Sequence, residues 1–219
     1  MTETTTPHAV SEKPRRGRPR GAPDASQARR DLIRAGLEHL TEKGYSAVGV
    51  DEILKAAKVP KGSFYHHFRS KADFGLALIA AYDSYFAGLL DQAFLDQGRS
   101  PLDRLRHFTE MAEAGMARHG FRRGCLVGNL GQEMGALPDD FRQALIGVLT
   151  TWQTRTADLF RDAQACGQLS AGLDPDALAQ AFWIGWEGAI LRAKLELSPA
   201  PLRTFTGLFS RLFDGGASP

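Results

Sequence analysis

The segment from Val50 to Lys71, VDEILKAAKVPKGSFYHHFRSK, limits what this chain can fold into more than any other part of it. Its first half carries apolar residues at the spacing of one helical face, namely Val50, Ile53, Leu54 and Ala57. A break at 58–60 follows, and a short second helix is expected over 60–67, because proline is tolerated in a first helical turn. Two short helices joined by a tight turn predict a helix-turn-helix, whose second helix enters the DNA major groove.

The second of these helices carries polar side chains where a buried helix would be aliphatic. Donors, stacking groups and one residue without a side chain make up the predicted DNA contacts: Lys61, Gly62, Ser63, Tyr65, His66 and His67. Phe64 and Phe68 are instead expected in the core. Lys71 lies near the start of the following helix, whose free N–H groups attract a phosphate.

The run AAKVPKGSFYHHFRSK and the upstream DLIRAGLEHLTEKGYSAVGVDEI resemble the DNA-binding domain of the TetR family of bacterial transcriptional regulators, over roughly residues 28–78. The resemblance implies that Tyr65 and Lys71 touch phosphates, with Ser63 and Lys61 near base edges. Lys58 stands where the family usually has glycine in the turn, so a positive φ is expected there.

Charge is distributed unevenly along the chain. The net charge is +2, but residues 13–71 hold 14 Lys and Arg against 6 Asp and Glu, whereas residues 72–219 hold 13 against 17. A basic N-terminal third on a faintly acidic body indicates a polyanionic partner for that third, although a solvated charged face would give the same count.

A basic arm precedes the helix-turn-helix. Residues 1–25 are polar and are expected to be disordered. Arg16, Arg18 and Arg20 lie in RRGRPR, which resembles an AT-hook and is predicted to bind in a narrow minor groove. The alternative is a generic basic tail with weak affinity for any duplex.

Composition excludes several classes of protein. Two cysteines are too few for a disulfide framework and fit a reducing compartment. No apolar run is long enough for a membrane span, and the N-terminus does not look like a signal peptide, so a cytoplasmic protein is expected. No phosphate loop, metal-ligand spacing or nucleophile–base motif is evident, which predicts no metal, no cofactor and no enzyme.

The helical periodicity predicts an all-α fold of about nine helices. The division expected is a basic arm over 1–25, a helix-turn-helix domain over 26–72, and a ligand-binding and dimerisation body over 73–219. Serine caps are expected at Ser26 and Ser100, a helix is expected to begin near Ser70, and Gly44 ends the first helix. The helices are expected over about 26–43, 48–57, 60–67, 70–95, 101–119, 138–166, 174–197 and 198–214, with a shorter, glycine-interrupted segment over 121–136.

The last two long helices predict a homodimer. Residues 177–197 are apolar around most of the helix, and the final helix has one broad apolar face. A symmetric four-helix interface with a second copy would bury both faces, and it would set two recognition helices apart by about one DNA turn or a multiple of it. Dimerisation through the last two helices is also what the family resemblance implies.

A second motif, GCLVGNL over 124–130, combines a thiol, an amide and flexible glycines, with a carboxylate at Glu133. Nearby Arg122 and Arg123 and a helix N-terminus favour a thiolate at Cys125, whereas a buried, inert cysteine is the alternative. The motif resembles a TetR subgroup with a Gly-Cys-Leu-x-Gly-Asn-Leu signature, whose members respond to reactive electrophiles or to small unsaturated acids such as acrylate. Cys125, Asn129 and Glu133 are therefore predicted to bind a small-molecule effector.

Aromatic and polar residues elsewhere complete the predicted effector site, although such stripes also pack ordinary cores. They are Tyr82, Phe108, Met111, Trp152, Trp183, Trp186, Glu187 and Lys194. A carboxylate effector would need a donor, which Arg192, Lys194 or Asn129 could supply.

The sequence thus predicts a repressor that binds a palindromic double-stranded DNA operator as a dimer and is released by a small molecule. A repressor of drug or electrophile efflux and detoxification genes, and an architectural DNA-binding protein, are the alternatives.

Overall fold

The computed structural model of this protein describes residues 25–214, with side chains from Ser26 to Arg211. Within these residues all regular structure is helical, which confirms the expected fold class. The predicted arm with Arg16, Arg18 and Arg20 lies outside the described residues. The helices are α1 (Ala25–Lys43), α2 (Val50–Ala57), α3 (Lys61–His67), α4 (Lys71–Phe94), α5 (Pro101–Ala117), α6 (Leu126–Gln132), α7 (Asp139–Ala165), α8 (Pro175–Glu196) and α9 (Ala200–Asp214).

Serine caps set the start of two long helices, and the one at Ser100 was expected from the sequence. The Ser70 hydroxyl accepts a hydrogen bond from the Asp73 N–H at 3.1 Å, and Ser100 accepts one from the Asp103 N–H at 3.3 Å. The prediction for Ser26 was wrong, because α1 already begins at Ala25 and the Ser26 hydroxyl accepts from the Arg30 guanidinium at 3.1 Å.

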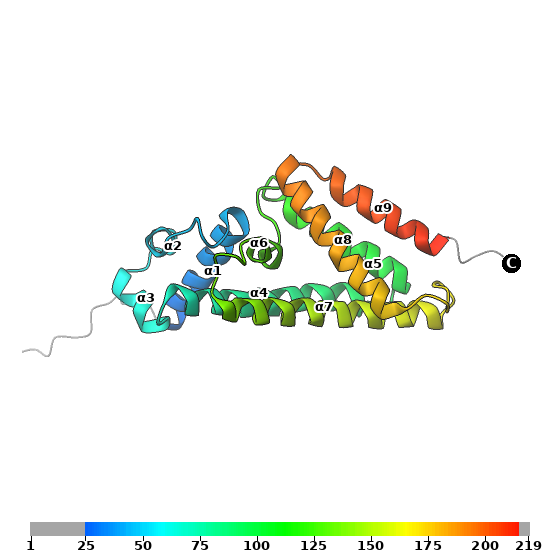
Figure 1. Ribbon diagram of the computed structural model, residues 1–219, viewed down its shortest axis with the longest axis horizontal. Coiled ribbons are helices and arrows are strands. Elements are labelled where there is room, and N and C mark those ends of the chain that lie inside the picture. Colours follow the sequence, from blue (N-terminus) through cyan, green and yellow to red (C-terminus); the bar gives the residue numbers. More distant parts are fainter. Residues whose placement is uncertain (1–24, 215–219) are drawn as a thin grey trace, which may run out of the picture.

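Helices α1, α2 and α3 form a compact head at one end of the molecule (Figure 1). Phe64 and Phe68 are buried in it, as predicted, and both rings pack against Phe74 of α4. Lys58 has a φ of 54°, so the turn between α2 and α3 does require the left-handed conformation expected there. Its N–H bonds back to Leu54 and Lys55 carbonyls, which closes α2.

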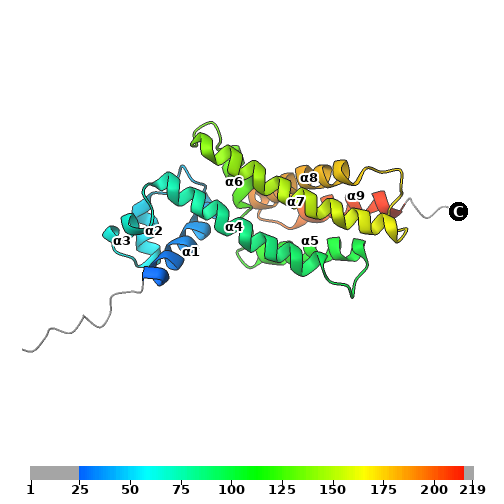
Figure 2. The ribbon, with the colours of Figure 1, turned by 90° about the horizontal axis from the view of Figure 1, so that it is seen from below.

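The rest of the chain forms an elongated body (Figures 1 and 2). Helix α4 leaves the head and runs along the long axis with α7, and α5, α8 and α9 pack over the far part. The body core is aromatic: Phe86 lies 4.1 Å from Trp152, and Trp152 lies 4.9 Å from Trp183, between ring centroids. The Trp183 indole N–H donates to Thr156 at 2.9 Å, which satisfies a polar group inside this core.

A membrane-spanning helix and a metal-binding cluster are both absent from the part of the chain that the structure describes. No helix there is long and apolar enough to cross a bilayer. No cluster of three or more His, Cys, Asp or Glu side chains there could hold a metal ion.

Candidate nucleic-acid interface and ligand cavity

Helix α3 presents the predicted DNA-contact residues to solvent. Tyr65 is 59% exposed, and its ring packs edge-on against the buried Phe64 at 5.3 Å between centroids. It therefore lies at the surface of the head, on top of the core. Lys61, Gly62 and His66 are also exposed, and Ser63 and His67 are half-buried. A short helix anchored by its phenylalanines and polar on its outer side has the form of a recognition helix.

The contacts of Lys61 and Gly62 leave this surface open to a partner. Lys61 pairs with Asp51 of α2 at 3.0 Å, but both side chains are largely exposed, and such pairs contribute about 0–1 kcal/mol. A side chain added at Gly62 would meet no atom within 4 Å. Packing within the protein therefore does not demand glycine there.

Lys71 faces the turn after α1 instead of open solvent. Its ammonium donates to the Tyr45 carbonyl at 2.8 Å and lies 4.2 Å from the centre of the Tyr45 ring. Burial lowers the pKa of Lys71 from its usual value, with Glu133 opposing that change. In this arrangement Lys71 ties α4 to the head, and contact with a phosphate stays a prediction.

Glu133, at the end of α6, holds the same turn from the body side. Its carboxylate accepts from the Tyr45 N–H at 2.9 Å and from the Ser46 N–H at 2.7 Å. Gly44 has a φ of +85°, and a Cβ at that residue would lie 2.0 Å from Glu133 Oε1. Glycine is thus required at 44 both for its backbone angle and for the close approach of the carboxylate.

The last carbonyls of α1 receive their hydrogen bonds from the body. The Thr41 carbonyl accepts from the Gly124 N–H at 3.0 Å, from the Asn129 amide at 2.8 Å and from the Lys194 ammonium at 3.2 Å. Asn129 also donates to the Leu40 carbonyl at 3.0 Å. The C-terminal carbonyls of a helix carry partial negative charge and lack partners in the helix, so amide and ammonium donors stabilise them.

These contacts define a head–body joint, made of Thr41, Tyr45, Lys71, Asn129, Glu133 and Lys194. Three of the residues predicted to bind an effector, Asn129, Glu133 and Lys194, are engaged with the head in this joint. Arg192, the other donor considered for a carboxylate, pairs with Glu196 on the surface of α8.

A cavity of about 650 Å³ lies beside the joint, between α1, α4, α5 and α8. It brings together four predicted effector residues: Tyr82, Met111, Cys125 and Trp186. Phe108, Trp183 and Trp152 lie behind it as core residues with at most 1% exposure. The walls also include Ile33 and Leu37 of α1, together with Tyr85, Phe86, Leu89, Met116 and Ile190.

The border of this cavity is cationic, which the sequence analysis did not foresee. It is lined by Arg29, Arg30, Arg34, Arg118 and Arg123, most of them exposed. Only the spacing of the arginines on the first helix, at i, i+1 and i+5, could have indicated a shared location. Glu38 is an acidic residue in the same lining, so the rim is predominantly and not wholly positive, and it raises the local concentration of small anions.

Glu187 of α8 places a carboxyl group behind the cavity wall. It lies under Gly128, where an added Cβ would come within 2.2 Å of Oε2. Part of the residue reaches the surface, but Oε1 is shielded from solvent and has no hydrogen-bond partner. Burial raises the pKa of Glu187 to about 7, with the Cys125 thiol opposing that change.

Cys125 fits the buried cysteine that the sequence left open, and not the alternative of a thiolate. The side chain is 4% exposed, and its burial and then the negative charge of Glu187 raise the pKa of the thiol well above its usual range. Arg123, expected to lower that pKa, lies 3.7 Å and 3.8 Å from the carboxylates of Glu38 and Glu42 on α1. The Gly128 N–H and the Tyr82 hydroxyl are close enough to oppose the effect, without reversing it.

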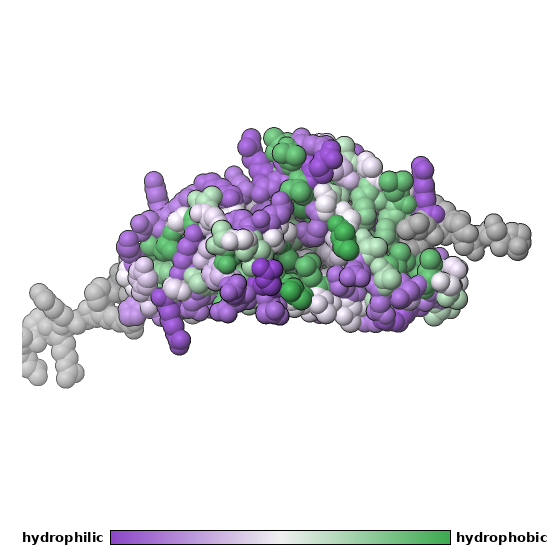
Figure 3. Space-filling model, viewed as in Figure 1, coloured by the Kyte–Doolittle hydropathy of each residue, from purple (hydrophilic) through white to green (hydrophobic). Residues whose placement is uncertain are grey.

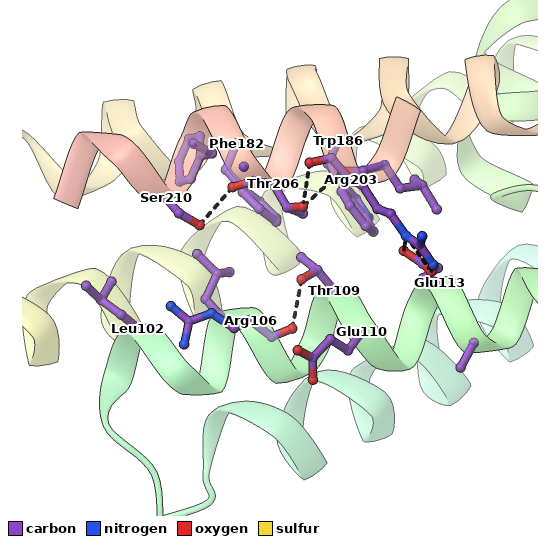
Figure 4. A pocket seen from close by; sticks show the side chains of 15 residues that line it. Leu102, Arg106, Thr109, Glu110, Glu113, Phe182, Trp186, Arg203, Thr206 and Ser210 are labelled. Atoms are coloured by element: carbon purple, nitrogen blue, oxygen red, sulfur yellow. Dashed lines mark hydrogen bonds and ion pairs between the residues drawn. The ribbon is translucent and has the colours of Figure 1, made fainter. Parts of the chain in front are cut away.

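A second cavity of about 570 Å³ lies between α5, α8 and α9 (Figure 4). Its hydroxyl groups already donate to helix carbonyls, as Thr109 does to Arg106 and Ser210 does to Thr206. Its two arginines are also paired, Arg106 with Asp103 at 2.5 Å and Arg203 with Glu113 at 2.6 Å. The cavity beside the joint is the stronger candidate, because its lining is mostly apolar and comes from helices of both the head and the body.

The fold is that of a helix-turn-helix protein with a helical body, and the comparisons agree. Residues 32–78 match the model "Bacterial regulatory proteins, tetR family", and residues 101–209 match "Tetracyclin repressor-like, C-terminal domain". The chain therefore belongs to the TetR family, whose members are typically DNA-binding transcriptional regulators without enzymatic activity.

Similar proteins span nearly the whole chain. The transcriptional regulator AcuR of Cereibacter sphaeroides is 80% identical over 97% of both chains, and the repressor DhaR of Mycobacterium sp. (strain GP1) is 33% identical over 81% of this chain and 87% of its own. A crystal structure of a regulatory protein TetR from Rhodobacter sphaeroides matches with a TM-score of 0.84 and 81% identity, over 85% of this chain and 98% of that one. Reduced NemR from Escherichia coli matches with a TM-score of 0.79 and 28% identity, over 88% and 98%.

Replacing Glu133 by Ala should loosen the joint. Two backbone donors lose a charged acceptor, so the free energy of unfolding should fall by about 1–3 kcal/mol in denaturant titration. The Tyr45 and Ser46 amides should exchange with deuterium faster. Gln132→Ala, an exposed change one residue earlier, is the matched control. Unaltered exchange at both amides would show that the joint does not depend on this carboxylate.

Glu187 should make stability depend on pH in a defined direction. Its pKa is raised from 4.5 to about 7, so the folded protein favours the protonated carboxyl group. The resulting contribution to the free energy of unfolding is complete below pH 4.5 and is lost as the pH rises through about 7. Relative to Glu187→Gln, the free energy of unfolding should fall by on the order of 3 kcal/mol across that window. Glu110→Gln, at an exposed glutamate, is the control. Parallel pH profiles for the wild type and Glu187→Gln would exclude an uncompensated buried carboxyl group.

Proposed function

We propose that this protein is a ligand-responsive transcriptional repressor that binds a palindromic operator as a homodimer and is released by a small unsaturated acid. The observation that carries this proposal is the cavity walled by α1 of the head and by α4, α5 and α8 of the body. A ligand in it touches both parts at once. The working division of the chain is a basic arm over 1–25, a DNA-binding domain over 26–72 and a ligand-binding and dimerisation domain over 73–219.

The DNA interface proposed here is the outer face of α3. Lys61, Tyr65 and His66 supply donors on exposed positions, and Gly62 leaves room for a sugar–phosphate backbone. Ser63, His67 and Lys71 complete the proposed contacts, together with Arg16, Arg18 and Arg20 of the arm.

The dimer is proposed to form through α8 and α9, as family members act as dimers. Large apolar side chains on α8 are exposed at i, i+7 and i+11, namely Ile184, Leu191 and Leu195, and Leu208 of α9 is 60% exposed. Apolar side chains reach the surface on the side of these helices (Figure 3). A continuous apolar stripe on paired helices is typical of an isologous interface.

Acrylate is the first candidate effector. The GCLVGNL motif resembles that of the acrylate-responsive repressor of dimethylsulfoniopropionate catabolism, and the arginine rim favours a small anion over a neutral drug. A thiol at the cavity wall keeps a related electrophile as the second candidate, with efflux or detoxification genes as its targets. In either case the head has one position that fits the operator and one that does not. The ligand can change the equilibrium between them only by the difference in its binding free energy for the two positions.

The DNA interface can be tested on an operator selected from a random duplex library. Lys61→Ala should weaken binding to the operator and lower the slope of log K against log salt, because a cation beside the base edges is lost from the interface. Tyr65→Phe should weaken binding with an unchanged slope, because a hydroxyl group releases no counterion. Lys55→Ala, at an exposed lysine of α2, is the control. Operator binding by Lys61→Ala with wild-type affinity and slope would exclude α3 as the docking helix.

The effector can be tested by thermal unfolding with acrylate, using propionate as the saturated control. At 100 times its Kd a ligand adds about 2.7 kcal/mol, which corresponds to a rise in Tm of about 5 °C or more for a chain of this size. The same acrylate concentration should release the selected operator. Acrylate that neither raises Tm nor releases DNA would rule it out as effector.

A further inference from the structure

Three groups from different helices meet at the cavity wall around one sulfur atom. Cys125 precedes α6 and lines the cavity, as does Tyr82 of α4. The Glu187 carboxyl group and Cys125 both lie against Gly128: a Cβ added at Gly128 would be 2.2 Å from Glu187 Oε2 and 3.8 Å from Cys125 Cβ, and glycine leaves this space to the carboxyl group. The Tyr82 hydroxyl and the Gly128 N–H approach the sulfur as donors.

This arrangement has the parts of an activated nucleophile. A carboxylate is placed to accept the S–H proton, while a hydroxyl and a backbone N–H are placed to stabilise negative charge on the sulfur. One oxygen of the carboxyl group, Glu187 Oε1, is buried without any partner. An unpaired buried carboxyl oxygen costs free energy, so a structural role alone gives no reason for its presence.

We propose that Glu187 is the proton acceptor that enables the Cys125 thiol to add to an electrophilic carbon–carbon double bond of a ligand in the cavity. This inference rests on the unsaturated ligand class of the proposed function. It assigns to Glu187 a chemical role in sensing, beyond that of a wall residue.

The step balances without any further reagent. The S–H bond of Cys125 breaks, its proton passes to the Glu187 carboxylate, and a C–S bond forms at the β-carbon of an alkene conjugated to a carbonyl group. The electron pair of the double bond moves to the α-carbon. That carbon then takes up the proton from Glu187, so the sum is addition of S–H across the double bond and the carboxylate is regenerated.

Burial makes such an acceptor necessary. Desolvation and the Glu187 charge raise the pKa of the Cys125 thiol, so a free thiolate is scarce near neutral pH. The pKa of Glu187 is about 7, which suits proton transfer at that pH. The titratable groups that face Glu187 are Tyr82 from α4 and Cys125 before α6, while Lys194 on α8 is directed to the Thr41 carbonyl.

Two roles for Glu187 predict opposite effects of Glu187→Gln. If the carboxylate only repels a thiolate, its removal speeds the reaction of Cys125. If it accepts the proton, its removal slows that reaction, and general-base assistance is typically worth 10²–10⁴-fold. The substitution keeps the size and shape of the side chain, so the cavity wall is preserved.

The test measures alkylation by acrylamide, a small neutral electrophile, in the full-length protein between pH 6 and 8.5. Peptide mass spectrometry follows Cys125, and Cys166, which is exposed, provides an internal reference in the same molecule. In the wild type the Cys125 rate should rise to about pH 7 and then level off. In Glu187→Gln it should fall at least about tenfold relative to Cys166. Glu187→Asp, which keeps a carboxylate, should be intermediate and retain the plateau.

An equal or faster Cys125 rate in Glu187→Gln would overturn the inference. If that variant does not fold, the wild-type profile decides, because a rate that keeps rising up to pH 8.5 excludes an acceptor titrating near 7. The alkylation assay contains neither DNA nor effector, so its result does not depend on operator release. If Cys125 is alkylated at a rate that depends on Glu187 but acrylate does not release the operator, the proposed function is contradicted and the role of Glu187 is not.

Discussion

The end of α1 is the constraint on which the arrangement of the molecule depends. Its final carbonyls have no partners within the helix, and a helix end that is covered by protein must find donors elsewhere. Here the donors are the Gly124 N–H, the Asn129 amide and the Lys194 ammonium, all from the body. Hydrogen bonds are directional, so these contacts fix the orientation of the head more narrowly than apolar packing would.

The same segments that hold the head also form the cavity wall. Cys125 follows Gly124 directly, and Glu187 lies two helical turns before Lys194 on α8. A ligand that displaces the wall at Cys125 therefore acts on residues adjacent in the chain to the donors of α1. The coupling needs no long pathway, since sensing groups and head contacts share short stretches of backbone.

The sequence predicted what depends on local pattern. Helix positions and the buried Phe64 and Phe68 follow from periodicity, the left-handed turn at Lys58 follows from the resemblance to a family that usually has glycine there, and the structure agrees. It could not predict partners far apart in the chain. Glu133 bonds to Tyr45, 88 residues away, and nothing near either residue encodes that pairing. The sequence could not decide between a thiolate and a buried thiol at Cys125 for the same reason: its arginine neighbour pairs with α1, while an acid from residue 187 lies beside it.

The joint touches α1 and the turn that follows it, and it leaves the outer face of α3 free. The surface that would choose a base sequence and the surface that would choose a metabolite thus share no side chain. Substitutions that change the preferred ligand therefore leave the DNA-contacting residues unchanged, and the reverse also holds. A lineage of such regulators could acquire a new inducer while keeping its promoters, provided that substitutions spare the few donors at the end of α1.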